Sequence, residues 1–168
     1  MARFGDPNPT ISFRQREFMD SVFHDCVLSR RLQELIRLRI AFHNQCRNCM
    51  AMRYKDAVED GVTEDLVCSL EHPEEAKDLS DADRAALRFA DLFATNHLAI
   101  DAPFIEGLRR HFTERQIYEI SISCATFVGF GRLAAISMDT DSLPEEFRRE
   151  SEEPVAPWGA HETLLVVP

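Results

Sequence analysis

Two cysteines three positions apart are the residues in this sequence whose chemistry most needs an explanation. Cys46 and Cys49 lie in the stretch AFHNQCRNCMAMR, directly after an apolar run. A pair at this spacing can bind a metal ion, cycle through a disulfide, or fill part of a core as small apolar side chains. The rest of the sequence has to decide among these three interpretations.

The metal interpretation has the least support. A structural zinc site needs four Cys or His ligands. His43, Cys46 and Cys49 offer three at a suitable spacing, but no second CxxC and no HxxxH motif completes them. Other histidines are scattered along the chain: His24, His72, His97 and His111. We therefore expect no metal and no organic cofactor.

The redox interpretation is favoured by the expected position of the pair. We predict a helix from about Cys46 to Gly61, so that both cysteines fall in its first turn. Unpaired backbone N–H groups and the positive end of the helix dipole stabilise a thiolate there, and thiol pKa values in such motifs fall well below about 8.5. We expect Cys46 and Cys49 to form the only ready intramolecular disulfide, while core filling stays an open alternative.

Size and composition are those of a globular domain. The 168 residues are 45% apolar and 29% charged, and the net charge is −10. This charge excludes nucleic acid and anionic membranes as main partners, because phosphate binding needs a basic surface. No apolar run approaches the ~20 residues of a membrane span, and the N-terminal MARFGDPNPT lacks the apolar core of a signal peptide. We expect a cytoplasmic protein.

The spacing of apolar residues predicts helices through most of the chain, and no pair of alternating segments gives a β-hairpin signal. The expected helices cover residues 13–28, 30–45, 46–61, 64–72, 83–96, 104–112 and 117–138. Their expected N-caps include Asn44, Thr63, Ser80, Asp101 and Thr113, the oxygen-bearing residues that accept the first free N–H groups of a helix. The fold class is therefore all-α. An irregular arm at 1–11 precedes the helical domain at 12–142, and an extended tail occupies 143–168.

The tail is too apolar to be freely solvated. Trp158 and the run Leu164 to Val167 follow a charged, proline-rich segment. Because exposed apolar patches usually mark an interface, we expect the tail to dock on this chain or on another. This supports a homo-oligomer.

Glu34 extends the pattern around the cysteines. Eleven residues separate it from Cys46, and the segments GVTEDLV and DRAALRFADLF follow further along the chain. In these features the sequence resembles the alkylhydroperoxidase D-like / carboxymuconolactone decarboxylase superfamily over roughly residues 25–138. The resemblance implies an AhpD-like helical bundle with the CxxC motif at the start of a central helix, assembled as a dimer, trimer or hexamer.

The resemblance also implies roles for the motif residues. In the redox branch of the superfamily, Cys49 would attack a hydroperoxide and become a sulfenic acid. Cys46, the more exposed cysteine, would then form the disulfide, and an external thiol reductant protein would reopen it. Glu34 would act as general base or relay anchor, or alternatively would pair with Arg37 or Arg53 for structure alone.

The sequence departs from the family pattern at Arg53, where the redox branch carries a proton-relay histidine. An arginine stays protonated and cannot shuttle protons. We expect Arg53 to lie one helical turn from Cys49, where its charge would stabilise the thiolate or hold Glu34. His43 would replace the missing imidazole if the end of its helix turned it inward.

These residues predict a thiol-dependent peroxidase or disulfide oxidoreductase that acts on a hydroperoxide or a disulfide. Two alternatives remain open. One is a non-enzymatic redox sensor, and the other is a carboxymuconolactone decarboxylase-like enzyme that acts on a small molecule without using the cysteines.

Overall fold

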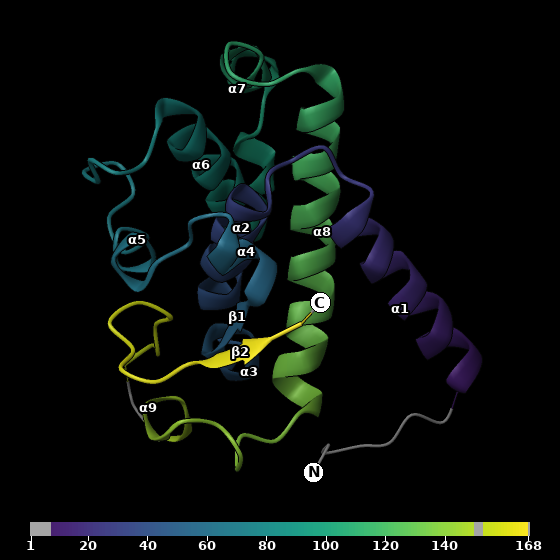
Figure 1. The fold of residues 1–168 in the computed structure, drawn as a ribbon. Coiled ribbons are helices and arrows are strands. Elements are labelled where there is room, and N and C mark those ends of the chain that lie inside the picture. Colours follow the sequence, from purple (N-terminus) through teal and green to yellow (C-terminus); the bar gives the residue numbers. More distant parts are fainter. Residues whose placement is uncertain (1–7, 150–152, 168) are drawn as a thin grey trace.

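Three helices form the centre of the molecule. In the computed structural model, which describes residues 8–149 and 153–167, α2 (Arg30–His43) packs against both α6 (Asp81–Thr95) and α8 (Glu114–Ser137). Figure 1 shows the long α8 beside α2, with α1 (Pro9–His24) crossing α8 at an angle on its other side. The central position of α2 matters because it carries Glu34 and leads directly into the cysteines.

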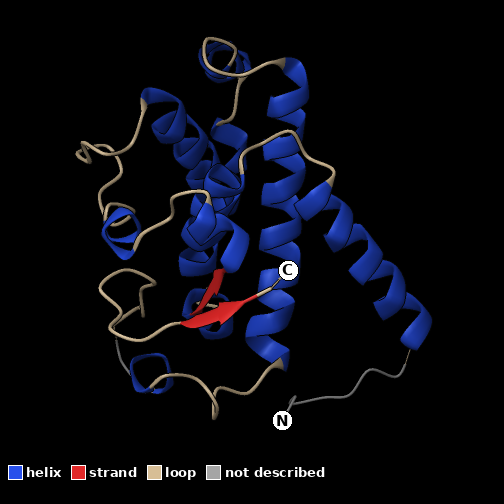
Figure 2. Cartoon of the chain, in the orientation of Figure 1, coloured by secondary structure: helices blue, strands red, loops and turns tan. Residues whose placement is uncertain are grey.

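The prediction of an all-α bundle is confirmed. The remaining helices are α3 (Arg47–Ala51), α4 (Lys55–Glu59), α5 (Glu64–Cys68), the 3-10 helix η1 (His97–Ala99), α7 (Ala102–Leu108) and α9 (Glu145–Arg148). The described strands are β1 (Met52–Tyr54) and β2 (Leu164–Val166), which form one short parallel ladder (Figure 2).

Four of the predicted N-caps are confirmed. Thr63, Ser80, Asp101 and Thr113 each accept a hydrogen bond from the backbone N–H three residues later. At Ser80 and Thr113 the side chain of the third helical residue also accepts the backbone N–H of the cap residue, which completes a capping box. These short-range signals fix where α5, α6, α7 and α8 begin.

The end of α2 explains why the fifth expected cap is wrong. Asn44 ends α2 instead of opening the next helix, and Gln45 follows in the left-handed region with φ 48°. The N–H of Cys46 reaches the carbonyl of Ala41 at 3.1 Å and that of Gln45 reaches Phe42 at 3.0 Å. These two bonds make a Schellman motif. Cys46 therefore becomes the N-cap of α3.

The predicted helix from Cys46 to Gly61 is also wrong, because it is broken in the middle. Helix α3 ends at Ala51, β1 takes the next three residues, and α4 starts at Lys55. Strand β1 pairs in parallel with β2, with Arg53 opposite Leu165. The partner strand comes from the far end of the sequence, so no local helical pattern could reveal the break.

The predicted N-terminal arm is too long, and the tail is not extended throughout. Helix α1 already begins at Pro9, capped by Asn8, so residues 9–11 are not part of an irregular arm. The tail forms α9 and β2 and docks on its own chain, where the Trp158 ring lies 4.6 Å from that of Phe42. Residues 1–7 of the predicted arm and 150–152 and 168 of the predicted tail lie outside the described residues.

Helix α8 is long and apolar enough, by length and composition, to cross a membrane. The sequence-based expectation missed this because Ser121, Ser123 and Thr126 interrupt the apolar run. One side of α8 packs into the core through Ile120, Cys124 and Phe127, which share a cluster with residues of α2 and α6. We therefore describe α8 as a core helix of the bundle.

Gly131 gives a first prediction about the contact between α2 and α8. A Cβ at Gly131 would lie 2.5 Å from Nδ2 of Asn44, which donates to the Phe127 carbonyl at 2.9 Å. Gly131→Ala should displace Asn44 and lower the free energy of unfolding. Gly129→Ala, in the same helix with no atom within 4 Å, should raise it by about 0.5–1 kcal/mol through helix propensity.

Urea denaturation of both variants measures this difference. The loss of one hydrogen bond is worth about 1 kcal/mol, so Gly131→Ala should be less stable than Gly129→Ala by about 1–2 kcal/mol. Equal stabilisation of the two variants would show that Asn44 moves away at no cost.

Candidate functional site

The two motif cysteines are joined in a disulfide. Cys46 and Cys49 are bonded, with their Cα atoms 5.2 Å apart. The other three cysteines, Cys26, Cys68 and Cys124, are free thiols. Burial raises the pKa of the Cys26 thiol and, far more strongly, that of Cys124. These two stay protonated and are poor nucleophiles, since the thiolate is the reactive form.

The exposure of the pair is the reverse of the prediction. Cys46, expected to be the more exposed, is fully buried, whereas Cys49 is half-buried and lines a cavity. The reason is the position of Cys46 at the N-cap of α3, where its sulfur turns inward and accepts the N–H of Cys49 at 3.3 Å. A molecule in the cavity therefore meets the sulfur of Cys49.

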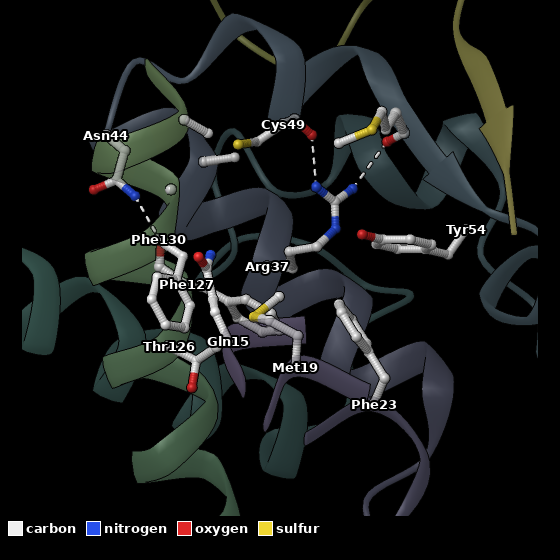
Figure 3. A pocket seen from close by; sticks show the side chains of 14 residues that line it. Gln15, Met19, Phe23, Arg37, Asn44, Cys49, Tyr54, Thr126, Phe127 and Phe130 are labelled. Carbon is white, nitrogen blue, oxygen red and sulfur yellow. Dashed lines mark hydrogen bonds between the residues drawn. The ribbon is translucent and has the colours of Figure 1, made fainter. Parts of the chain in front are cut away.

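The cavity has a volume of about 210 Å³ and lies between α1, α2, the CxxC segment and α8 (Figure 3). Most of its wall is apolar, and five side chains add polar groups. The apolar wall includes Met19, Phe23, Ala41, Met52, Phe127 and Phe130, and the polar groups belong to Gln15, Arg37, Asn44, Tyr54 and Thr126. Such a lining suits a small, largely apolar organic molecule with one polar end.

Glu34 is buried in an ion pair with Arg37. Its two carboxylate oxygens accept hydrogen bonds from Nε of Arg37 at 2.6 Å and from Nη2 at 2.7 Å. Both side chains are at most 5% exposed. Glu34 thus forms the structural ion pair that was one of its two expected roles. Glu34 is not among the residues that line the cavity.

Arg37 connects this ion pair to the cysteine segment. Its Nη1 donates to the carbonyl of Cys49 at 2.6 Å and its Nη2 to that of Met52 at 2.9 Å. Its guanidinium stacks over the Tyr54 ring at 5.0 Å. Burial alone would lower the pKa of Arg37, but the charge and hydrogen bonds of Glu34 outweigh burial and raise it. A permanent positive charge therefore lies beside Cys49.

Arg53 lies on the other face of the chain, not one helical turn from Cys49. In β1 successive side chains alternate, so Met52 and Tyr54 line the cavity while Arg53 points away. Arg53 is 2% exposed and forms a salt bridge with Glu64 at 2.9 Å. It also donates to the carbonyls of Met50, Met52 and Pro157.

His43 is likewise turned away from the cysteines. Its Nε2 lies 2.6 Å from a carboxylate oxygen of Asp91 on α6, which also accepts from Arg39 at 2.7 Å. Burial acts to raise the pKa of Asp91, yet the hydrogen bonds from His43 and Arg39 hold it below its usual range. Among the described residues, no group of three or more His, Cys, Asp or Glu side chains could hold a metal ion.

The structure therefore brings Cys46, Cys49 and Glu34 together through Arg37, and leaves Arg53 and His43 outside this group. Sequence analysis named Arg37 as a possible ion-pair partner of Glu34, and its spacing, three residues after Glu34, does place the two side chains on one helix face. It missed that Arg37 and Tyr54 line the cavity beside Cys49. Tyr54 had no such signal, because its orientation depends on β1.

Comparison with known proteins supports the relationship that this site suggests. A sequence model of the carboxymuconolactone decarboxylase family matches residues 14–92, a range that includes Glu34 and both motif cysteines. Two solved structures share the fold. Residues 14–92 thus resemble the carboxymuconolactone decarboxylase family, and the fold of the chain is AhpD-like.

The two structural neighbours extend the likeness over most of the chain. A protein of unknown function from Agrobacterium tumefaciens, provisionally assigned as the antioxidant defence protein AhpD, has a TM-score of 0.69 and 21% identity, with 80% of this chain and 93% of the other covered. An uncharacterised peroxidase-related protein from Ralstonia eutropha, described as an alkylhydroperoxidase AhpD core, has a TM-score of 0.65 and 21% identity, with 88% and 77% covered. At this identity the likeness shows the AhpD-like fold.

The matching curated relatives are much longer proteins. Uncharacterised proteins from two strains of Mycobacterium tuberculosis are 32% identical to this chain over 90 residues, which are 52% of this chain and 31% of the relative. The chain thus spans about a third of the length of the curated relatives it matches.

The placement of Arg53 gives a second prediction. Arg53→Met removes hydrogen bonds from a buried charge to three carbonyls and should lower the free energy of unfolding by about 2–3 kcal/mol. The pH profile of Cys49 alkylation in the reduced protein should stay unchanged, because Arg53 faces away from the cavity. Lys55→Met, which removes a charge from a 58% exposed side chain, is the control for loss of charge. If the alkylation profile moves to higher pH in Arg53→Met but not in the control, Arg53 acts on the Cys49 thiol and belongs to the site.

Proposed function

We propose that this protein is a thiol-dependent peroxidase or disulfide oxidoreductase that works through Cys49 and Cys46. The observation that carries the proposal is the position of Cys49. Its sulfur borders a largely apolar cavity while it is bonded to a buried partner cysteine, beside the permanent charge of Arg37. Nearness to an arginine favours a thiolate, the form in which cysteine attacks.

The proposed first half-reaction oxidises the pair. The Cys49 thiolate attacks the terminal oxygen of an organic hydroperoxide, so that an S–O bond forms and the O–O bond breaks. Sulfur loses two electrons and the peroxide becomes an alcohol, after its alkoxide takes a proton from water. The Cys46 thiol then displaces hydroxide from the sulfenic acid, which yields the disulfide and one water molecule.

The second half-reaction needs an external dithiol. One of its thiolates attacks the accessible sulfur of Cys49 and Cys46 leaves as a thiolate. The N–H of Cys49, 3.3 Å from the Cys46 sulfur, is in position to stabilise this leaving group. The second thiol of the reductant then releases Cys49. A thiol reductant protein supplies the two electrons and two protons, and this need supports the cytoplasm as the location of the protein.

A redox sensor is a second candidate because the tail is fastened directly to the cysteine segment. Gln45, next to Cys46, exchanges two hydrogen bonds with the backbone of Val155, at 3.0 and 2.9 Å. Arg47, between the cysteines, donates to the Arg148 carbonyl at 3.2 Å. A change at the disulfide would therefore act on the tail. In this role the pair would respond to oxidation without catalytic turnover.

We also propose that the chain forms a homo-oligomer through the face of α1 and the C-terminal half of α8. The original reason, an apolar tail that cannot be buried locally, holds only in part: Trp158 packs on Phe42, whereas Leu164, Leu165 and Val167 are 37%, 62% and 78% exposed. Further support comes from large apolar side chains left exposed on α1 and on the C-terminal half of α8: Ile11 (65%), Phe13 (50%), Phe18 (41%), Leu133 (40%) and Ile136 (62%). A second copy would cover apolar surface of the kind that usually marks an interface.

The cysteine roles give a third prediction, measured by the turnover of an organic hydroperoxide with a dithiol reductant. Cys49→Ser should reduce turnover to background, because the nucleophile is lost. Cys46→Ser should also stop turnover but leave a sulfenic acid on Cys49 that a dimedone trap detects by mass spectrometry. Cys68→Ser, at an exposed free cysteine, should behave as the unaltered protein.

Three other results would separate the alternatives. Disulfide formation without turnover in the unaltered protein would favour the sensor. A small-molecule activity that survives replacement of both Cys46 and Cys49 would favour the decarboxylase-like enzyme. A dominant disulfide through Cys26, Cys68 or Cys124 after mild oxidation would remove the basis of the proposal.

The exposed face gives a fourth prediction. Ile136→Glu should shift the sedimentation mass toward that of a monomer at micromolar concentration, because it would bury an unpaired charge in the interface. Leu98→Glu is the matched control, since Leu98 is 83% exposed on η1 and should leave the mass unchanged. Equal masses for the two variants would rule out this face as the interface.

A further inference from the structure

The hydrogen bonds of Arg37 leave one donor unused. A guanidinium has five N–H groups: one on Nε and two on each Nη. Nε donates to Glu34, and Nη2 donates to Glu34 and to the Met52 carbonyl. Nη1 donates once, to the Cys49 carbonyl at 2.6 Å. Within the described part of the chain, the second N–H of Nη1 has no acceptor.

This unused donor belongs to a buried, fixed charge in the cavity wall. Arg37 is 4% exposed, and it lines the same cavity as Cys49. Glu34 occupies the Nε edge of the guanidinium, and the two carbonyls occupy its end. The remaining N–H therefore lies on the edge opposite Glu34. In Figure 3 that edge faces the Cys49, Gln15 and Met19 side of the cavity.

The surroundings keep the guanidinium from rotating toward another acceptor. Its four hydrogen bonds come from three different segments: α2, α3 and β1. The Tyr54 ring lies against its face at 5.0 Å, and Phe23 supports that ring at a centroid distance of 5.0 Å. A donor held in this way needs no reorganisation when negative charge develops nearby, which is the condition for strong electrostatic catalysis.

We propose that Arg37 is a catalytic residue whose free Nη1–H binds the leaving oxygen of a hydroperoxide during attack by Cys49. This inference rests on the proposed peroxidase function. As the S–O bond forms and the O–O bond breaks, the leaving alkoxide accepts the Arg37 hydrogen bond and takes its proton from water. Arg37 gives up no proton. It supplies the stabilisation that a relay histidine would otherwise provide.

In this arrangement Glu34 is a positioning residue. Both of its oxygens are held by Arg37, and the carboxylate does not border the cavity. It aligns the guanidinium by a bidentate pair, the strongest geometry for an arginine and a carboxylate. The general-base role first expected for Glu34 is therefore replaced by a role that acts through Arg37.

The test compares Arg37→Lys with Arg39→Lys, two arginines on α2 that each pair with a carboxylate. The rate of Cys49 oxidation is measured with cumene hydroperoxide and with peroxyacetic acid, at a pH where the Cys49 thiolate is fully formed in each variant. Loss of one donor to a developing oxyanion typically costs about 100-fold or more. Arg37→Lys should lose about this factor with the hydroperoxide.

The leaving group separates catalysis from a general disturbance of the site. Peroxyacetic acid releases a weakly basic carboxylate, so its rate in Arg37→Lys should fall less than tenfold. Alkylation of the Cys49 thiolate by iodoacetamide, which needs no oxygen donor, should change less than threefold. Arg39→Lys should leave both peroxide rates unchanged. Equal losses with both peroxides and in alkylation would assign Arg37 a purely structural role.

A second variant tests the same role if Arg37→Lys does not fold. Glu34→Leu with Arg37→Met removes both charges together, which usually costs little in stability because no buried charge is left unpaired. It should show the same selective loss with the hydroperoxide. Unchanged rates would overturn the role of Arg37. Failure of the unaltered protein to reduce either peroxide would instead overturn the proposed peroxidase function, so the two ideas fail separately.

Discussion

The buried ion pair between Glu34 and Arg37 is the interaction on which the site depends. Two charges removed from water are stable only when their hydrogen-bonding capacity is met. Glu34 meets part of this requirement, and the carbonyls of Cys49 and Met52 meet more of it. These carbonyls stand at the end of α3, where no intrahelical N–H follows. The ion pair therefore also fixes where the cysteine helix stops.

A second arginine completes this helix end from the opposite side. Arg53 donates to the carbonyls of Met50 and Met52, and its remaining contacts go to Glu64 and Pro157. Basic side chains often satisfy the last carbonyls of a helix. Here two of them do so for a helix of only five residues, and β1 can then leave α3 in an extended conformation and pair with β2.

Local signals predicted much of the fold. The hydroxyl and carboxylate caps at Thr63, Ser80, Asp101 and Thr113 act within three residues, so the sequence alone locates the starts of four helices. The cysteine pair was equally visible, because its spacing is a local property. The break after Ala51 could not be predicted in this way, because it depends on pairing with β2 and on hydrogen bonds from a side chain of α2. No window around the motif contains these partners.

The same break decides which residues the site contains. In an uninterrupted helix, Arg53 would follow Cys49 by one turn, and a charge at that position would face the sulfur. In β1 successive side chains point to opposite sides, so Arg53 contacts the tail and Tyr54 lines the cavity. The positive charge beside Cys49 comes instead from α2, a full helix earlier in the sequence. The position of a residue relative to a motif therefore predicts its orientation only if the backbone between them has the expected conformation.

The tail helps to determine which side chains face the cavity. Its backbone accepts from Arg53 at Pro157, pairs with β1 through β2, and bonds Gln45 at Val155. The cysteine segment is thereby held on both sides by residues more than a hundred positions later. Because Gln45 occupies a left-handed conformation that costs roughly 1–2 kcal/mol for a residue with a side chain, its two bonds to Val155 help offset that cost. The geometry that presents Cys49 to the cavity is consequently a property of the docked tail as much as of the CxxC motif.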